Sequence, residues 1–221
     1  MAAIRDAIGD SPDLAVDVHV AIRETALSLE LARVITPYRL MFIEEPARAE
    51  FIESSAELRR EFRVALATGE NLYGIHRFTE LLNADAVDII QPDMLCCGGL
   101  LEAKKIAAVA EAHYVTVAPH NPIGGLSTAV CTHFAASTGN FLILEYRLDS
   151  EGPDAKLLRH PVQYDDGYLV IPEAARHLKA GRYITALVKP QFEAPKEQVG
   201  RGGVIKDPKV HAAVLGKMVN W

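Results

Sequence analysis

Several features that mark specialised classes of protein are scarce or absent in this chain of 221 residues. Its three cysteines, Cys96, Cys97 and Cys131, form no Cys-x-x-Cys pair, so neither a disulfide framework nor a zinc site is predicted. No run of about 18 apolar residues occurs, so no membrane-spanning helix is indicated. The N-terminus lacks the long apolar segment of a signal peptide. We therefore expect a cytoplasmic protein in a reducing compartment.

An excess of positive charge is also absent. The formal net charge is −6 at pH 7, which gives no reason to expect nucleic acid or an anionic membrane as a partner. Hydrophobic residues make up 49% of the chain and charged residues 24%, as in ordinary globular proteins. At this length the chain can bury a sizeable apolar core.

What the chain does contain is a repeated pattern in which a short apolar run leads to a charged or imidazole side chain. The polar residues follow one another at steps of 23 to 27 residues, and they are Asp17, Glu44, Glu70, Asp93, His120 and Glu145. A period of about 25 residues is the length of one strand, one helix and two loops. Because parallel strands place their carboxyl ends on one face, we expect these six groups to meet at one site.

The apolar runs are continuous rather than alternating, which is typical of strands buried on both faces. Strands are predicted at 14–18, 40–44, 64–68, 87–91, 115–118 and 141–145. Helices are predicted at 1–9, 24–35, 55–62, 75–83, 100–113 and 126–137. The fold class is α/β, with about six parallel β/α units over residues 1–148. The remainder, 149–221, is an irregular C-terminal extension with a hairpin at an Asp-Gly turn and a terminal helix.

Six short motifs occur in order, each following a predicted strand. They are Asp17-Val18-His19, Phe42-Ile43-Glu44-Glu45-Pro46, Thr68-Gly69-Glu70-Asn71, Gln91-Pro92-Asp93, Gly98-Gly99 and Pro119-His120-Asn121-Pro122. With these motifs, residues 1–148 resemble the enolase superfamily. The resemblance is strongest to the mandelate racemase subgroup, and within it to sugar-acid dehydratases of the galactonate and mannonate type.

The resemblance implies a TIM-type (β/α) barrel, a separate capping domain and bound Mg²⁺. It also implies that a proton next to a substrate carboxylate is removed. The implied metal ligands are Asp17, Glu44 and Glu70. The implied catalytic residues are His120 as the base, Asp93 as its orienting partner, Glu145 beside the substrate carboxylate and His19 as the acid that assists the leaving hydroxyl.

These residue types suit that chemistry. Removing a proton beside a carboxylate places a second negative charge on the same group, and a hard cation stabilises that charge. Mg²⁺ prefers oxygen ligands, which carboxylates supply. An acidic partner at one ring nitrogen of a histidine fixes its tautomer and leaves the other nitrogen to act as the base. Glu45 lies next to Glu44 and competes with it as a ligand. The spacing to Glu70 favours Glu44, and we expect Glu45 to form a supporting salt bridge.

A complete barrel has eight strands, and the pattern supplies six. Relative to the family, the capping domain and the first two strands are expected to be missing. Residues 168–171 and 183–188 are candidates for two further barrel strands; otherwise inner apolar side chains are expected to be exposed. The predicted function is Mg²⁺-dependent dehydration of an aldonic acid to a 2-keto-3-deoxy acid. The alternatives are a racemase or epimerase and an inactive fragment, and self-association is left open.

Overall fold

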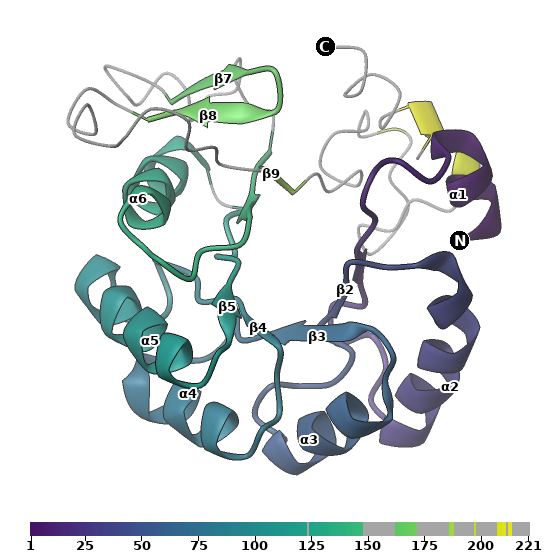
Figure 1. The fold of residues 1–221 in the computed structure, drawn as a ribbon, viewed down its shortest axis with the longest axis horizontal. Coiled ribbons are helices and arrows are strands. Elements are labelled where there is room, and N and C mark those ends of the chain that lie inside the picture. Colours follow the sequence, from purple (N-terminus) through teal and green to yellow (C-terminus); the bar gives the residue numbers. More distant parts are fainter. Residues whose placement is uncertain are drawn as a thin grey trace.

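The computed structural model describes residues 1–122, 124–147, 162–171, 186–187, 197, 207–210 and 212–213. Within these residues, helices and strands alternate, and an arc of helices surrounds the strands (Figure 1). The predicted α/β class is confirmed. The predicted boundary between residues 148 and 149 lies at the edge of a stretch outside the described residues, so it stays a prediction. None of the described helices is long and apolar enough to cross a membrane.

Five parallel strands form one sheet in which spatial order follows chain order. They are β1 (Val16–Asp17), β2 (Phe42–Glu44), β3 (Ala65–Thr68), β4 (Ile89–Ile90) and β5 (Thr116–Val117). Each strand lies inside a predicted apolar run but is shorter than it. An unbroken order without reversal is the pattern of a barrel wall, whereas a doubly wound sheet reverses direction. The structure is therefore a partial barrel.

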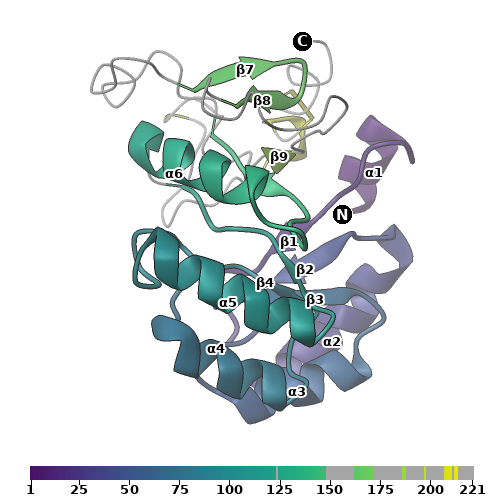
Figure 2. The ribbon, with the colours of Figure 1, turned by 60° about the vertical axis from the view of Figure 1, so that its left-hand side comes forward.

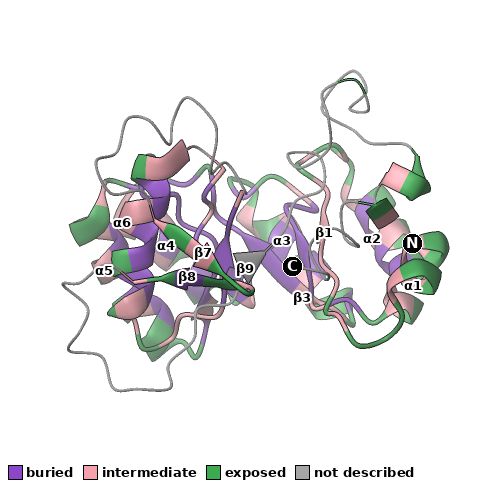
Figure 3. Cartoon of the chain, turned by 90° about the horizontal axis from the view of Figure 1, so that it is seen from above, coloured by how far each residue is buried: buried purple, intermediate pink, exposed green. Residues whose placement is uncertain are grey.

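The helices lie outside this wall, close to where the apolar periodicity predicts them (Figure 2). They are α1 (Ala2–Ile8), α2 (Thr25–Ile35), α3 (Ile52–Glu61), α4 (Gly74–Asn83), α5 (Leu100–Ala112) and α6 (Gly124–Ala136), with a 3₁₀ turn η1 (Thr36–Tyr38) after α2. Seen from above, burial is concentrated along the strands and the inner faces of the helices (Figure 3). The crossovers between parallel strands are thus helical, as in a β/α repeat.

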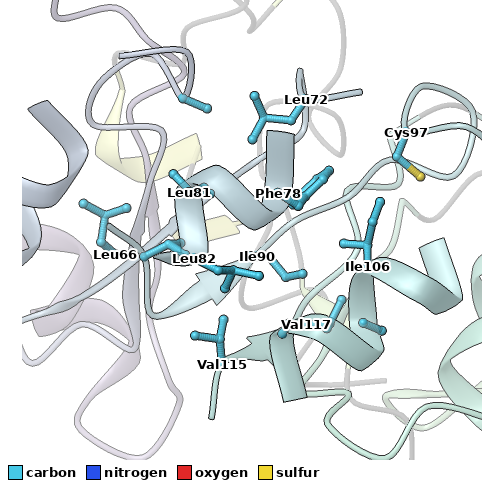
Figure 4. Close-up of a cluster of buried hydrophobic side chains, with 14 of the residues drawn as sticks. Leu66, Leu72, Phe78, Leu81, Leu82, Ile90, Cys97, Ile106, Val115 and Val117 are labelled. Carbon is cyan, nitrogen blue, oxygen red and sulfur yellow. The ribbon is translucent and has the colours of Figure 1, made fainter. Parts of the chain in front are cut away.

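Side chains of each strand alternate between two apolar clusters. Leu66, Ile90 and Val117 point outward to the helices, where they pack in one cluster with Phe78 and Ile106 (Figure 4). The second cluster fills the barrel interior and consists of Phe42, Ala67, Ile89, Ala118 and Ile143. Its members are at most 5% exposed, so the predicted exposure of inner apolar side chains is wrong for them.

The sixth strand departs from the simple repeat. β6 (Leu144–Glu145) does not continue the five-stranded ladder, and only an isolated bridge between Val117 and Phe141 joins this segment to β5. β6 instead pairs in parallel with β9 (Ala186–Leu187), so the candidate strand at 183–188 is confirmed at these two residues. Because the two strands are far apart along the chain, no local sequence period predicts that they pair.

The Asp-Gly turn produces the predicted hairpin. β7 (Gln163–Asp165) and β8 (Tyr168–Val170) pair antiparallel, so 168–171 is not a barrel strand. Tyr164 stacks on Tyr146 at 5.7 Å between ring centroids, which anchors the hairpin beside the end of β6. The predicted terminal helix is present at 208–210 and 212–213; its remaining positions lie outside the described residues.

Candidate active site

The alternation of the strands decides which polar residues face the interior. Phe42 belongs to the interior cluster, so Glu44 two residues later lies on the same face of β2. Asp17 pairs in register with Glu44 on the neighbouring strand. By the same parity Glu145, two residues after the interior Ile143, faces inward. Three of the predicted site residues therefore share the interior face at the carboxyl ends of their strands.

Glu70 is positioned by a glycine turn rather than by a strand. Gly69 follows β3 with φ +127°, a conformation that side chains rarely tolerate. A Cβ atom at Gly69 would lie 2.8 Å from Cε1 of Phe78, which is fully buried. Glycine at this position therefore allows the chain to turn closely over α4 and bring Glu70 to the site.

His120 and Asp93 form a hydrogen-bonded pair in the site. His120 Nδ1 lies 2.8 Å from Asp93 Oδ2, and the other oxygen, Oδ1, accepts the backbone N–H of Leu95 at 2.6 Å. Burial opposes ionisation of Asp93, but the hydrogen bonds from His120 and Leu95 outweigh it and lower the pKa of the carboxyl. An ionised Asp93 favours a proton on Nδ1 of His120, and Nε2 of His120 lies 3.3 Å from Glu70 Oε2.

His19 lies above the carboxylates at the mouth of the barrel. Its backbone N–H donates to Asp17 Oδ1 at 2.8 Å, and its φ of +51° turns the chain back over the strand end. Its ring Nδ1 lies 3.9 Å from Asp17 Oδ2 and 3.9 Å from Glu70 Oε1. The His19 side chain is 73% exposed, so its ring is accessible from solvent.

Glu45 turns away from the interior, since its φ is +45° directly after β2. Its Oε1 accepts hydrogen bonds from the Thr68 hydroxyl and from the backbone N–H of Gly69, the latter at 3.1 Å. The predicted salt bridge is wrong: in the described structure the partners of Glu45 are neutral donors. The outcome favours Glu44 as the residue that faces the interior.

The pKa of Glu45 is affected by the other acidic residues nearby. Burial raises the pKa of Glu45, and its two hydrogen bonds oppose the rise. The carboxylates of Glu70 and Asp17 raise it further. These groups therefore create a strongly negative environment at the ends of β1, β2 and β3.

Asn121 is not among the site residues that the sequence predicts. Its backbone N–H donates to Glu145 Oε2 at 2.8 Å, and its side-chain Nδ2 donates to the Glu145 carbonyl at 2.9 Å. Both residues are buried. Its position directly after His120 in the Pro-His-Asn-Pro motif is the one signal that pointed to it.

The acidic residues fit Mg²⁺ by chemistry but do not form a closed ligand set. Oε2 of Glu70 is buried and accepts no hydrogen bond from the described residues, as expected of an oxygen available to a cation. Among those residues, however, no group of three or more His, Cys, Asp or Glu side chains is arranged to hold a metal ion. A shared cation would offset the repulsion between these carboxylates. The ligand set Asp17, Glu44 and Glu70 stays a prediction.

Comparisons with known proteins agree with this arrangement. Residues 1–175 match the family profile described as enolase C-terminal domain-like. A D-galactonate dehydratase of Xanthomonas euvesicatoria pv. vesicatoria is 34% identical over 184 residues, which are 82% of this chain and 47% of that protein. The chain thus spans about half the length of this relative.

Solved structures show the same fold. An enolase from Agrobacterium radiobacter, crystallised with sodium and L-malate, is 39% identical with a TM-score of 0.70, over 75% of this chain and 45% of that one. The 3,6-anhydro-D-galactonate cycloisomerase of Zobellia galactanivorans is 29% identical with a TM-score of 0.70, over 77% of this chain and 48% of that one. Chains with this barrel therefore include more than one named activity on galactonate-type acids.

Proposed function

Because the chain belongs to the enolase C-terminal domain-like family, we propose that it is the barrel portion of a Mg²⁺-dependent sugar-acid dehydratase. The substrate is an aldonic acid of the galactonate type, and the product is a 2-keto-3-deoxy acid. Two observations support this class: the 34% identity to a D-galactonate dehydratase and the presence of L-malate, a small hydroxy acid, in a relative that is 39% identical.

The observation that carries the proposal is the contact between partly buried His120 and buried Asp93, at 2.8 Å. With Asp93 holding a proton on Nδ1, His120 Nε2 would take the proton from C2 of the substrate. When bound by Asp17, Glu44 and Glu70, Mg²⁺ would stabilise the negative charge that develops on the substrate carboxylate. Glu145 lies on the same interior face and would hydrogen-bond that carboxylate.

Elimination follows from the position of His19 at the mouth. The C3–O bond breaks as the C2–H bond electrons form the C2=C3 double bond, and the hydroxyl takes a proton from His19 and leaves as water. The resulting enol then tautomerises to the 2-keto acid. A barrel that lacked an acid at this position would return a proton to C2, and delivery of that proton to the opposite face would make it an epimerase instead.

The test is to incubate the protein with a panel of aldonic acids and Mg²⁺ and to measure 2-keto acid formation. His120→Asn should lower the rate about 10²–10⁴-fold, the usual contribution of a positioned base. His133→Asn is the matched control, because His133 is exposed on α6 away from the strand ends and its variant should keep full activity. Dehydration that survives His120→Asn would exclude His120 as the base.

The same assay separates the alternatives. Exchange of the substrate C2 proton with deuterium from solvent, together with a product inverted at C2 and no keto acid, would identify an epimerase or racemase. Neither exchange nor product across the panel would identify the chain as inactive on its own.

A further inference from the structure

The ends of β5 and β6 lie side by side without a strand ladder between them. Below this gap, Val117 accepts the backbone N–H of Leu142 at 2.8 Å and donates its own to the Asn140 carbonyl at 2.9 Å. No backbone hydrogen bond joins Ala118–His120 to Ile143–Glu145 in the described structure. These are the strand ends that carry His120 and Glu145, and a side-chain contact joins them.

Asn121 supplies that contact. Its backbone N–H donates to the carboxylate of Glu145, and its side-chain amide donates to the carbonyl of Glu145. The amide of Asn121 is itself oriented, because Nδ2 also donates to Thr128 Oγ1 at 3.0 Å. The Thr128 hydroxyl donates to the Gly124 carbonyl at 3.2 Å, so the side chain that orients Asn121 is itself bonded to the first turn of α6.

We propose that Asn121 is a positioning residue that replaces the missing ladder between β5 and β6 and holds the Glu145 carboxylate beside His120. This role rests on the proposed function for its catalytic consequence, but its structural part stands on the contacts alone. Asn121 does not need to touch the substrate, because it acts through Glu145. A displacement of about 1 Å at a group that aligns substrate can lower turnover by about 100-fold.

The chain contains a matched control in Asn140. Its Nδ2 also donates two hydrogen bonds to acceptors on other elements, to the Ala107 carbonyl at 3.1 Å and to the Val115 carbonyl at 2.9 Å. Asn140 lies at the opposite end of β5, on the turn that leads into the β6 segment. Replacing either asparagine by alanine removes the same donors, but only Asn121 is next to the site.

The experiment has one readout that does not require activity. The backbone N–H of residue 121 remains in Asn121→Ala, so its hydrogen exchange, followed by NMR, reports whether the Glu145 carboxylate still covers it. We expect exchange at residue 121 to accelerate at least about tenfold in Asn121→Ala and to be unchanged in Asn140→Ala. Thr128→Val, which removes the orienting hydroxyl with little change of shape, should give a smaller acceleration and serves if Asn121→Ala does not fold.

Where the wild type dehydrates an aldonic acid, Asn121→Ala should lower kcat about 10- to 100-fold with little change in KM, while Asn140→Ala should leave kcat unchanged. Unaltered exchange at residue 121 in both Asn121→Ala and Thr128→Val would overturn the proposal, as would an equal loss of kcat in Asn140→Ala. If the wild type shows no activity, the proposed function fails while the exchange measurement still decides the role of Asn121.

Discussion

The two sides of the site differ in how they are held. On the side of β4, β5 and β6, His120 is fixed by Asp93, and Glu145 is fixed by Asn121, at distances of 2.8 Å. On the side of β1, β2 and β3, Asp17 Oδ1 accepts the backbone N–H of His19 at 2.8 Å, but the described acidic side chains form no closed ligand group for a metal ion, and Glu70 Oε2 accepts no hydrogen bond from the described residues. We refer to these as the base side and the carboxylate side.

The difference follows from charge. A histidine and an aspartate attract each other, so the protein can organise a base before any substrate binds. Carboxylates repel one another, so a cation bound between Asp17, Glu44 and Glu70 would offset that repulsion. The His120–Asp93 contact forms without a ligand, whereas we expect the carboxylate side to respond to a cation. Changes on the carboxylate side should be measurable as changes in stability and metal response.

The largest effect is expected at the turn that delivers Glu70. Gly69→Ala should destabilise the fold by about 3 kcal/mol, because the new Cβ would clash with buried Phe78 and the backbone has φ +127°. Gly9→Ala is the control, since Gly9 also has positive φ (+70°) but nothing lies within 4 Å of its Cβ position; it should cost about 1 kcal/mol. Urea denaturation measures both, and equal losses would show that contact with Phe78 is unimportant.

Magnesium should stabilise the carboxylate side by mass action. At 100 times its dissociation constant, a ligand that binds only the folded state adds about 2.7 kcal/mol to the free energy of unfolding. Glu44→Gln should remove most of this gain, while Glu57→Gln, exposed on α3, should keep it. Thermal or urea unfolding with and without Mg²⁺ measures the gain. A full response in Glu44→Gln would exclude that carboxylate as a ligand.

A smaller effect, within about 1 kcal/mol, is expected at Glu45 in metal-free buffer. Its pKa is raised in the folded protein, so the folded state binds the proton more tightly than the unfolded state does. Ionisation therefore costs stability as pH rises from the ordinary value of 4.5 to the folded value, and the full cost persists above it. Glu45→Gln avoids this cost, so its advantage over wild type should be larger at pH 7 than at pH 4. A stability advantage of Glu45→Gln that does not change with pH would contradict a raised pKa of Glu45 in the folded protein.

Much of the fold could be predicted because each β/α unit has its own pattern of apolar residues in the local sequence. The continuous apolar runs predict all six helical and strand positions of the repeat, and the period of about 25 residues predicts that polar residues gather at one end. The pairing of β6 with β9 has no such pattern, because Leu144 and Ala186 are far apart along the chain. Strand pairing over such a distance depends on packing that no local pattern encodes.

The site was predictable only in part for similar reasons. Spacing and motif favoured Glu44 over Glu45, but the partner of Glu45 was predicted as a cation, whereas a left-handed backbone turn directs it to Thr68 and Gly69. Asn121 was missed because its contacts with Glu145 are between residues 24 positions apart, which the local sequence does not reveal. The spacing of Asp17, Glu44 and Glu70 along the sequence likewise does not determine how closely their carboxylates approach one another.

The smallest expected effect is on thiol reactivity, which can report on both sides at once. Cys96 is exposed, whereas Cys97 and Cys131 are buried, and burial raises their pKa values to about 11 and about 12. A thiol reagent should therefore label one cysteine quickly in the folded protein and all three in urea.

The pH dependence of that fast label connects the two sides. Burial and the nearby carboxylates of Asp93 and Glu70 raise the pKa of Cys96, so its labelling rate should still be rising above pH 9. Mg²⁺ held by Glu70 would cancel part of that negative charge, which lowers the thiol pKa and should speed labelling at a fixed pH of about 8. Ca²⁺-free, Mg²⁺-free buffer with EDTA is the reference, and Glu70→Gln should remove the Mg²⁺ effect. Slower labelling with Mg²⁺ would indicate instead that the cation or its ligands cover Cys96, and the carboxylate side would then close over the base side when metal binds.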